Sequence, residues 1–217
     1  MKKNIILMGP PGAGKGTLAS SLRDELHLAH ISTGDMFREA IKAGTHLGQK
    51  AQQYIAAGDL VPDSVTIGLV KERLSQDDCQ NGFLLDGFPR TLVQAEALQE
   101  LSKEISRPIG VVINLECDEN VLIDRISGRR VCTKCGTPYH IRNKKPLQEG
   151  ICDHCGGALI QRPDDNEVAF KVRLQHYAHD TKPLLDYYAK QGLLVSFDAT
   201  DSIEHIFDEV INFLEKE

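Results

Sequence analysis

Short apolar segments alternate along the chain with longer segments of helical periodicity. The segment 109–115 is almost continuously apolar, which is typical of a parallel strand buried on both faces. Strands that alternate with helices indicate a parallel sheet with right-handed crossovers and helices on both sides. The pattern therefore predicts an α/β fold with a five-stranded parallel sheet covered by helices. The five strand-length segments are 5–8, 29–31, 83–86, 109–115 and 193–197.

The helical segments begin and end at recognisable signals. Gly58 follows one of them, and Pro62 breaks the chain before Asp63, which we interpret as the cap of the next helix. Three candidate N-caps lie within 32–35. The stretch 32–61 therefore has the pattern of a small helical insertion. The predicted helices span 18–26, 36–41, 48–57, 63–74, 91–104, 121–127, 167–182 and 201–215.

Length and charge narrow the class of protein. The 217 residues are enough for one substantial core with insertions. The net charge of −6 argues against a dedicated surface for nucleic acid or acidic membranes, because phosphate binding there rests on a basic face. No apolar run reaches the length of a membrane span, and the first residues lead into a strand rather than a signal sequence. We therefore expect a cytoplasmic protein without nucleic-acid or membrane partners.

A glycine-rich stretch, residues 9–17, joins the first strand to the first helix and is called the glycine loop below. Glycines let successive N–H groups turn inward, and the helix adds its N-terminal partial positive charge, so the loop suits phosphate. Gly14 and Lys15 fit the Walker A spacing, with Lys15 supplying a full charge to the phosphates. Gly16 takes the usual Ser/Thr position and the hydroxyl follows at Thr17, so direct Mg²⁺ ligation by Thr17 stays open. The alternative is a glycine-rich turn with a solvated lysine.

Polar side chains follow two of the other predicted strands. Asp86 ends an apolar run, as does the aspartate of a Walker B strand that positions Mg²⁺, although such an aspartate is also a common turn residue. Arg90 follows at the carboxyl end of that strand, where open α/β sheets place their ligands. Arg38 lies on the first turn of a short helix, near any anion attracted to that end, or is a solvated surface arginine.

Further charged residues flank the later helices. Arg125, Arg129 and Arg130 are expected at the end of the helix 121–127, where an interaction with the helix C-terminus would explain them. Two aspartates, residues 164 and 165, can be interpreted simply as caps of the helix that follows.

Four of the six cysteines form two C-x-x-C pairs separated by sixteen residues. This is the spacing of a four-cysteine zinc ribbon. Two disulfides are the alternative, which a reducing compartment disfavours. Four thiolates fill the coordination shell of zinc and leave no position for water, so the metal is expected to be structural. The predicted ligands are Cys132, Cys135, Cys152 and Cys155.

Taken together, these motifs closely resemble the adenylate kinase family, in its bacterial form with a long zinc-bearing lid. The resemblance spans the chain from end to end. A glycine after the lysine of the loop is typical of these kinases, which accounts for Gly16. The matching stretches are 9–17, 32–35, 86–90 with Gln94, 128–130 and 162–165.

The resemblance implies the reaction ATP + AMP ⇌ 2 ADP, with Mg²⁺ and a structural Zn²⁺, in a monomer. It also implies a P-loop core of residues 1–31, 62–127 and 166–217, an AMP-binding domain of residues 32–61 and a lid of residues 128–165. The implied ATP-binding residues are Gly12, Ala13, Gly14, Lys15, Gly16, Thr17, Arg125, Arg129 and Tyr139, with Thr17 and Asp86 near Mg²⁺. The implied AMP-binding residues are Thr33, Arg38, Leu60, Val61, Gly87, Arg90, Gln94, Arg162 and Arg173. Those implied to be catalytic are Lys15, Arg90, Arg129, Arg162 and Arg173.

Two other functions remain open at this point. One is a related kinase that uses a different donor or acceptor nucleotide, because the sequence encodes donor-base contacts poorly. The other is a zinc-ribbon module gated by ATP that binds nucleic acid or a partner protein. The second leaves Arg38, Arg90 and Gln94 without a role.

Overall fold

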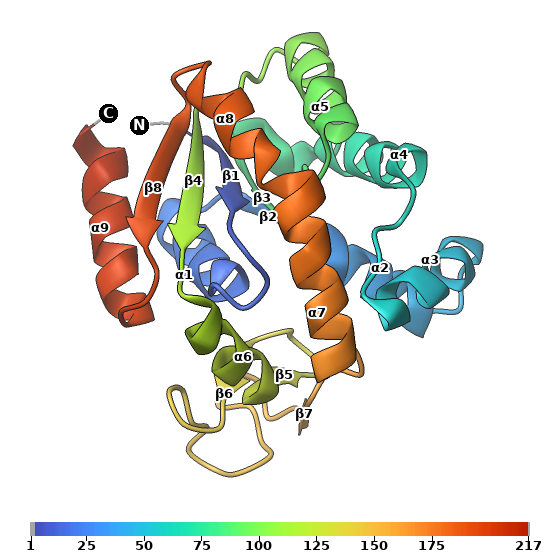
Figure 1. Cartoon of the computed structure of the whole chain (residues 1–217), viewed down its shortest axis with the longest axis vertical. Helices are drawn as coiled ribbons and strands as arrows, with labels where there is room; N and C mark the ends of the chain where they lie inside the picture. The colour runs from blue at the N-terminus through green and yellow to red at the C-terminus, as the bar shows by residue number, and fades with distance from the viewer. Residues whose placement is uncertain (1–2, 217) are drawn as a thin grey trace.

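A computed structural model describes residues 3–216, and its centre is a five-stranded sheet (Figure 1). All four strand pairings are parallel, and the order is β2-β3-β1-β4-β8. The predicted α/β fold and its five-stranded sheet are therefore confirmed. The strands are β1 (Asn4–Met8), β2 (Ala29–Ser32), β3 (Phe83–Asp86), β4 (Val111–Glu116) and β8 (Leu194–Asp198).

Helices cover both faces of this sheet. Successive residues of β1 point to opposite faces, so Ile5 and Leu7 pack with α1 (Lys15–Leu26) and α9 (Ile203–Lys216). Ile6 and Met8 pack on the other side. There the covering helices are α4 (Asp63–Leu74), α5 (Leu92–Glu104) and α8 (Pro183–Ala189). Burial of the strands on both faces explains why β1, β3 and β4 are apolar along most of their length.

The stretch 32–61, called the insertion below, forms two packed helices beside the sheet (Figure 1). They are α2 (Thr33–Lys42) and α3 (His46–Ala57), and their apolar side chains form a small cluster that residues of α4 complete. The Ser32 hydroxyl accepts a hydrogen bond from the Asp35 N–H at 3.3 Å, so the helix begins at Thr33, earlier than expected.

Residues 128–165, called the cysteine segment below, lie beyond the carboxyl ends of the main strands (Figure 1). They form a small antiparallel sheet of β6 (Pro138–His140), β5 (Arg129–Cys132) and β7 (Leu159–Ile160). The placement of Arg129 and Arg130 at the end of a helix was wrong. The helix α6 (Glu119–Ser127) stops before them, because both arginines pair with residues of β6 in the ladder.

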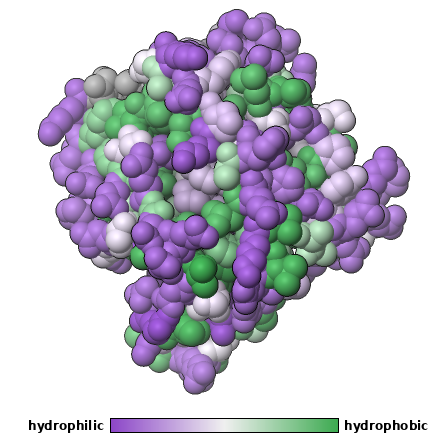
Figure 2. Space-filling view, viewed as in Figure 1, coloured by the Kyte–Doolittle hydropathy of each residue, from purple (hydrophilic) through white to green (hydrophobic). Residues whose placement is uncertain are grey.

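The chain returns to the core through α7 (Glu167–His176), a π-helical turn at Tyr177–Thr181, and α8. A short 3₁₀ helix, Asp77–Asn81, precedes β3. Within residues 3–216, none of the helices has the length and hydropathy of a membrane-spanning helix. Hydrophilic residues cover most of the face shown in Figure 2, and hydrophobic residues appear there in separate patches.

Gly9 is the position where the glycine loop passes closest to a strand. Its φ is +136°, and a Cβ atom there would lie 2.6 Å from the Leu115 carbonyl oxygen. Gly68 offers a contrast, because it lies in α4 with nothing within 4 Å of an added Cβ.

We expect Gly9→Ala to destabilise the fold by about 2 kcal/mol or more, because the side chain adds both backbone strain and a clash. Gly68→Ala is the matched control and should stabilise α4 by up to about 1 kcal/mol through helix propensity. Urea unfolding followed by far-UV circular dichroism measures both values. Equal unfolding midpoints for Gly9→Ala and the wild type would contradict the steric argument.

His176 ties the end of α7 to the end of the insertion. Its Nε2 lies 3.1 Å from Asp59 Oδ1, and its Nδ1 lies 2.8 Å from Asp180 Oδ2. A neutral imidazole donates through only one nitrogen, so both contacts are satisfied only in the protonated form. The hydrogen bond with Asp180, helped by Asp59, raises the pKa of His176 above its ordinary value. Asp180 also contacts His179, at 2.7 Å.

A raised pKa in the folded state means that this contribution to stability is complete below the unfolded-state pKa of about 6.5. It is lost as the pH rises through the raised value. We therefore expect the thermal midpoint of the wild type to fall above neutral pH. That part of the fall should be absent in His176→Gln and smaller in Asp59→Asn, which keeps the hydrogen bond to Asp180. Thermal unfolding scans from pH 6 to pH 9 test this, and identical pH profiles for all three proteins would contradict it.

Candidate functional site

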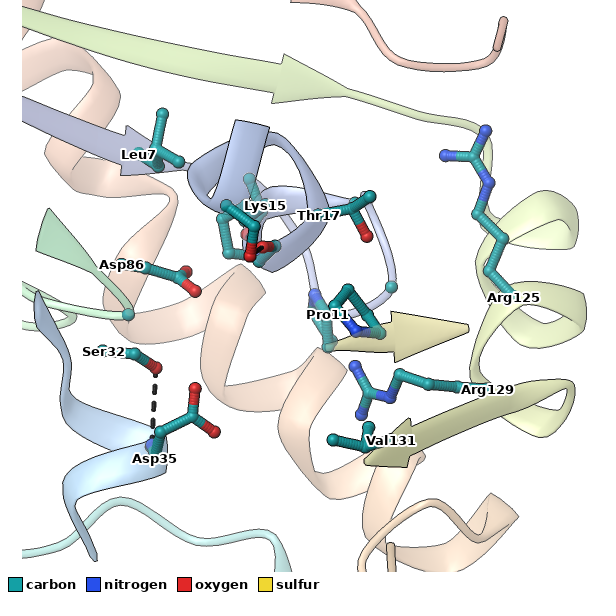
Figure 3. Close-up of a pocket in the computed structure, with 18 of the residues that line it drawn as sticks. Leu7, Pro11, Lys15, Thr17, Ser32, Asp35, Asp86, Arg125, Arg129 and Val131 are labelled. Carbon is teal, nitrogen blue, oxygen red and sulfur yellow. Dashed lines mark hydrogen bonds between the residues drawn. The ribbon is translucent and has the colours of Figure 1, made fainter. Parts of the chain in front are cut away.

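The carboxyl ends of β1, β2 and β3 open into a cavity of about 750 Å³. The glycine loop, the insertion, the cysteine segment and the start of α9 contribute its walls. Figure 3 shows Lys15 and Thr17 beside the loop, with Asp86 and Asp35 on one side and Arg129 on the other. The site therefore gathers residues from all three regions identified in the sequence.

The glycine loop follows β1 and leads into α1, as predicted. The Lys15 ammonium is held within it, donating hydrogen bonds to the carbonyl oxygens of Gly9 at 2.7 Å and Pro10 at 2.8 Å. Burial lowers the pKa of Lys15 to about 8, although the Asp86 carboxylate acts in the opposite direction. The side chain is thus a partly buried cation whose hydrogen-bond acceptors are neutral carbonyl oxygens. A phosphate oxygen would be a stronger partner.

Asp86 lies at the end of β3, facing the loop (Figure 3). Burial opposes ionisation of its carboxyl group. The His30 imidazole, whose Nε2 is 3.9 Å away, and the Lys15 ammonium together hold the pKa of Asp86 below its ordinary value. The carboxylate is therefore charged and lies next to the loop, as a Mg²⁺-associated aspartate requires.

Arginines line the rest of the cavity and are balanced by three aspartates. Asp165, whose side chain is fully buried, forms an ion pair with Arg129. Asp164 Oδ2 lies 3.1 Å from Arg173 Nη1. Asp35 Oδ1 accepts from Arg38 at 2.7 Å and from Arg162 at 3.0 Å, the latter reaching across from the cysteine segment. The arginines on this cavity include Arg38, Arg90, Arg125, Arg129, Arg162 and Arg173.

The interpretation of 164–165 as helix caps was wrong. Asn166 caps α7, with its Oδ1 accepting from the Ala169 N–H at 2.9 Å. The two aspartates are buried among arginines instead, because a buried guanidinium group without a counter-charge is strongly destabilising.

Burial and the nearby Arg129 lower the pKa of Arg173 to about 10. Burial and the nearby Arg38 and Arg129 do the same for Arg162, again to about 10. Both groups nevertheless stay protonated at neutral pH. The cavity therefore presents a concentration of positive charge that suits a polyanion such as a chain of phosphates.

A second, smaller cavity adjoins the first, and the residues that line both include Leu60, Gly87 and Arg90. The Thr33 hydroxyl donates to the Gly87 carbonyl oxygen at 2.9 Å, and the Arg90 Nε donates to the same oxygen at 2.8 Å. The other walls are largely apolar, with polar groups from Asp59, Thr66 and a buried amide. The predicted residues on this cavity are Thr33, Leu60, Val61, Gly87, Arg90 and Gln94. Its volume is about 30 Å³, so a base would require it to widen, but the largely apolar lining beside the anion site suits a flat group such as a base.

Comparison with known proteins agrees with this geometry. Residues 7–193 match the family model described as adenylate kinase. Adenylate kinases of Bacillus subtilis strain 168 and Geobacillus sp. strain WCH70 are each 51% identical over 211 residues, which is 97% of this chain and at least 97% of theirs. The adenylate kinase of Archaeoglobus fulgidus is 50% identical over 213 residues, or 98% of both chains. The chain belongs to the adenylate kinase family.

Membership of the adenylate kinase family confirms the resemblance stated from the sequence motifs. It makes the chain a kinase and favours that class over a zinc-ribbon binding module. The P-loop core, the insertion and the cysteine segment are the parts of an adenylate kinase fold that the motifs predicted.

Two residues expected at the ATP side lie at the edge of the larger cavity. Arg125 donates to the backbone carbonyl oxygens of Ala199 at 2.7 Å and Asp201 at 3.1 Å, so it links α6 to the loop before α9. Tyr139 is 6% exposed, and its hydroxyl accepts from the Asp153 N–H at 2.8 Å and lies 3.5 Å from Cys152 Sγ. Its hydroxyl is therefore engaged inside the cysteine segment. Ala13 lies in the loop with its side chain buried in the core.

The four cysteines of the C-x-x-C pairs converge, with all Sγ atoms within 4.8 Å of one another. The distances are 3.4 Å for Cys132–Cys155, 3.6 Å for Cys135–Cys152 and 3.3 Å for Cys135–Cys155. A tetrahedral ion with metal–sulfur bonds of about 2.3 Å needs sulfur atoms about 3.8 Å apart. The arrangement therefore fits one metal ion bound by four thiolates.

Some residues of the site were not identified from the sequence. Asp35 was considered only as a helix cap, and its ion pairs depend on Arg162, which lies far away in the chain. The loop before α9 lines the larger cavity through Thr200, Asp201 and Ser202. These short polar residues resemble any loop, so only their place in the fold could have identified them.

Proposed function

We propose that this chain catalyses the reversible transfer of the terminal phosphoryl group of MgATP to AMP, giving two ADP. The observation that carries the proposal is the convergence of the glycine loop, Lys15 and the arginine cluster on one cavity, which adjoins a smaller one with a largely apolar lining. Family membership supports the same reaction.

Phosphoryl transfer needs little covalent chemistry from the protein, so positioning and charge stabilisation dominate. Lys15 and the loop amides would hold the phosphates of ATP. Arg90 and Arg38 would hold the phosphate of AMP, while Arg129, Arg162 and Arg173 would stabilise the group in transfer. An oxygen of the AMP phosphate is already an anion, so no general base is required.

Four of these arginines would exchange a carboxylate partner of the protein for a phosphate oxygen of the substrate: Arg38, Arg129, Arg162 and Arg173. The carboxylates of 35, 164 and 165 hold these side chains close to the cavity, and this arrangement reduces the reorganisation needed on binding. Mg²⁺ would neutralise charge on the ATP phosphates, with Asp86 and Thr17 beside it.

The expected domain organisation gives each substrate its own region. The insertion, residues 32–61, would be the AMP-binding domain, with Thr33, the backbone near Leu60 and Val61, Gly87 and Gln94 reading the base. The cysteine segment would be a lid over ATP, near Arg125 and Tyr139. The remaining residues, 1–31, 62–127 and 166–217, would be the core, of which 1–2 and 217 lie outside the described residues. Closure would exclude water, which would otherwise accept the phosphoryl group.

The finer expectations follow from the same groups. Zn²⁺ in the thiolate cluster would stabilise the lid, outside the chemistry. A monomer is expected from the resemblance to the family. The thiols of 132, 135, 152 and 155 surround one centre rather than being bonded in pairs, which supports a reducing compartment such as the cytoplasm.

The assay for the proposed function is ADP formation from MgATP with and without AMP. The wild type should form ADP only when AMP is present. Lys15→Met should reduce turnover by about 10²–10³-fold with an unchanged circular dichroism spectrum, because it removes a charge from the phosphate site without opening a core cavity. Near-normal turnover by the folded variant, or ADP formation that ignores AMP, would refute the assignment.

The metal is expected to be structural. A segment of this size buries few apolar side chains, so metal binding should supply its folding free energy. Cys132→Ser, or chelation of the wild type, should remove one zinc per chain and lower the thermal midpoint, while some turnover remains below the new midpoint.

Cys117→Ser is the matched control, because Cys117 lies outside the cluster and should leave one zinc bound. Metal content by mass spectrometry, thermal unfolding and ADP formation are measured on the same samples. Complete loss of turnover in a variant whose cysteine segment is still ordered would instead make the metal catalytic.

A further inference from the structure

The side-chain amide of Gln94 lies in the wall of the smaller cavity and is 2% exposed. Two groups of opposite polarity hold it. Its Nε2 donates to Asp63 Oδ1 at 2.7 Å, and its Oε1 accepts from the backbone N–H of Arg90 at 2.8 Å. The amide is thus fixed from both ends.

The chemistry of these two partners determines which way the amide points. A carboxylate only accepts hydrogen bonds, and a backbone N–H only donates. Rotating the amide of Gln94 by 180° would place its oxygen against Asp63 and its NH₂ group against the Arg90 N–H. Both hydrogen bonds would then become repulsive contacts in a buried place, where unsatisfied polar groups are destabilising.

Asp63 is itself held in position by α5. The Thr91 hydroxyl accepts from the Gln94 N–H at 3.2 Å, so its own proton is free to point to Asp63 Oδ1, 3.0 Å away. Asp63 is the first residue of α4, where a negative charge is favourable. One carboxylate oxygen therefore receives two hydrogen bonds from the start of the neighbouring helix.

These contacts correct the interpretation of Asp63 as a helix cap. Pro62 occupies the cap position of α4, and no side chain caps that helix. A cap residue would direct its oxygen to the N–H groups of its own helix. The carboxylate of Asp63 instead contacts α5, and the residue it fixes lies on a cavity wall.

The fixed amide retains one N–H and one oxygen lone pair for the cavity, since each end uses only one of its two bonding positions in the protein. Adenine carries a 6-amino group that donates and a neighbouring ring nitrogen that accepts. A 6-oxopurine has an oxygen that accepts at position 6 and, at N1, a proton that donates. The two amide orientations therefore match different bases.

We propose that Asp63 is a positioning residue that sets the preference for adenine over 6-oxopurines by fixing the amide of Gln94. This inference rests on the proposed function, with Gln94 facing the base of the monophosphate. Asp63 touches neither substrate and acts through Gln94 alone.

The test compares AMP with inosine monophosphate as acceptor, at saturating MgATP, in Asp63→Asn. An asparagine has nearly the same shape, but its amide can present either a donor or an acceptor to Gln94. When the Gln94 amide is flipped, the asparagine NH₂ group can donate to its oxygen, so this contact is no longer repulsive. The ratio of kcat/KM for AMP to that for inosine monophosphate should fall about tenfold. The change should appear in the KM of the monophosphates, with the KM of ATP within twofold of the wild type.

Two variants separate positioning from a general structural role. In a Gln94→Ala background, Asp63→Asn should leave the ratio unchanged, because the group through which it acts is gone. Glu119→Gln is the matched control, since it also removes a carboxylate from the first residue of a helix, α6, and should not alter the ratio. Both acceptors are measured on one preparation, so a partly unfolded sample leaves the ratio unaffected.

An unchanged ratio in Asp63→Asn, with normal phosphorylation of AMP, would overturn the inference and leave the proposed function intact. An equal shift in the Gln94→Ala background would also overturn it. Failure of the wild type to phosphorylate AMP would instead refute the proposed function, so the two failures are distinguishable.

Discussion

Several guanidinium groups around one cavity repel each other, and the rest of the site depends on how that repulsion is balanced. Asp35, Asp164 and Asp165 each form an ion pair with at least one arginine of the cavity. The carboxylates come from the insertion and from the cysteine segment, so neutralising the charge also determines where both regions lie. The ion pairs that neutralise the cavity therefore also position the insertion and the cysteine segment.

The parallel sheet makes such a concentration of charge possible. Its strands end at one edge, so the turn after β1 and the turn after β3 lie next to each other. Lys15 from the first turn is therefore close to Asp86 and Arg90 from the second, although the two turns are about seventy residues apart in the sequence. The buried core on both faces holds those turns still. The glycine loop is packed closely against the sheet at Gly9, where the backbone lies against the Leu115 carbonyl with no room for a side chain.

The fold and the loop could be predicted because their signals are local. Apolar runs, glycine spacing and paired cysteines each lie within a short stretch of chain. Arg129, Asp165 and Asp63 could not be placed in this way, because each depends on a partner more than twenty residues away. In the sequence these residues look like ordinary helix ends. The resemblance to a family supplied roles for the arginines, but not for the carboxylates that hold them.

The hydrogen bonds of Asp35 have a consequence for how tightly substrate is held. Its carboxylate joins Arg38, in the insertion, to Arg162, in the cysteine segment. Under the proposed function, the phosphate of AMP competes with this internal anion, so its observed affinity is the difference between two ion pairs rather than the strength of one. Added salt screens the exposed part of both. Ionic strength should therefore act less on affinity than the number of arginines at the site would suggest, and more on the rate at which the two regions separate.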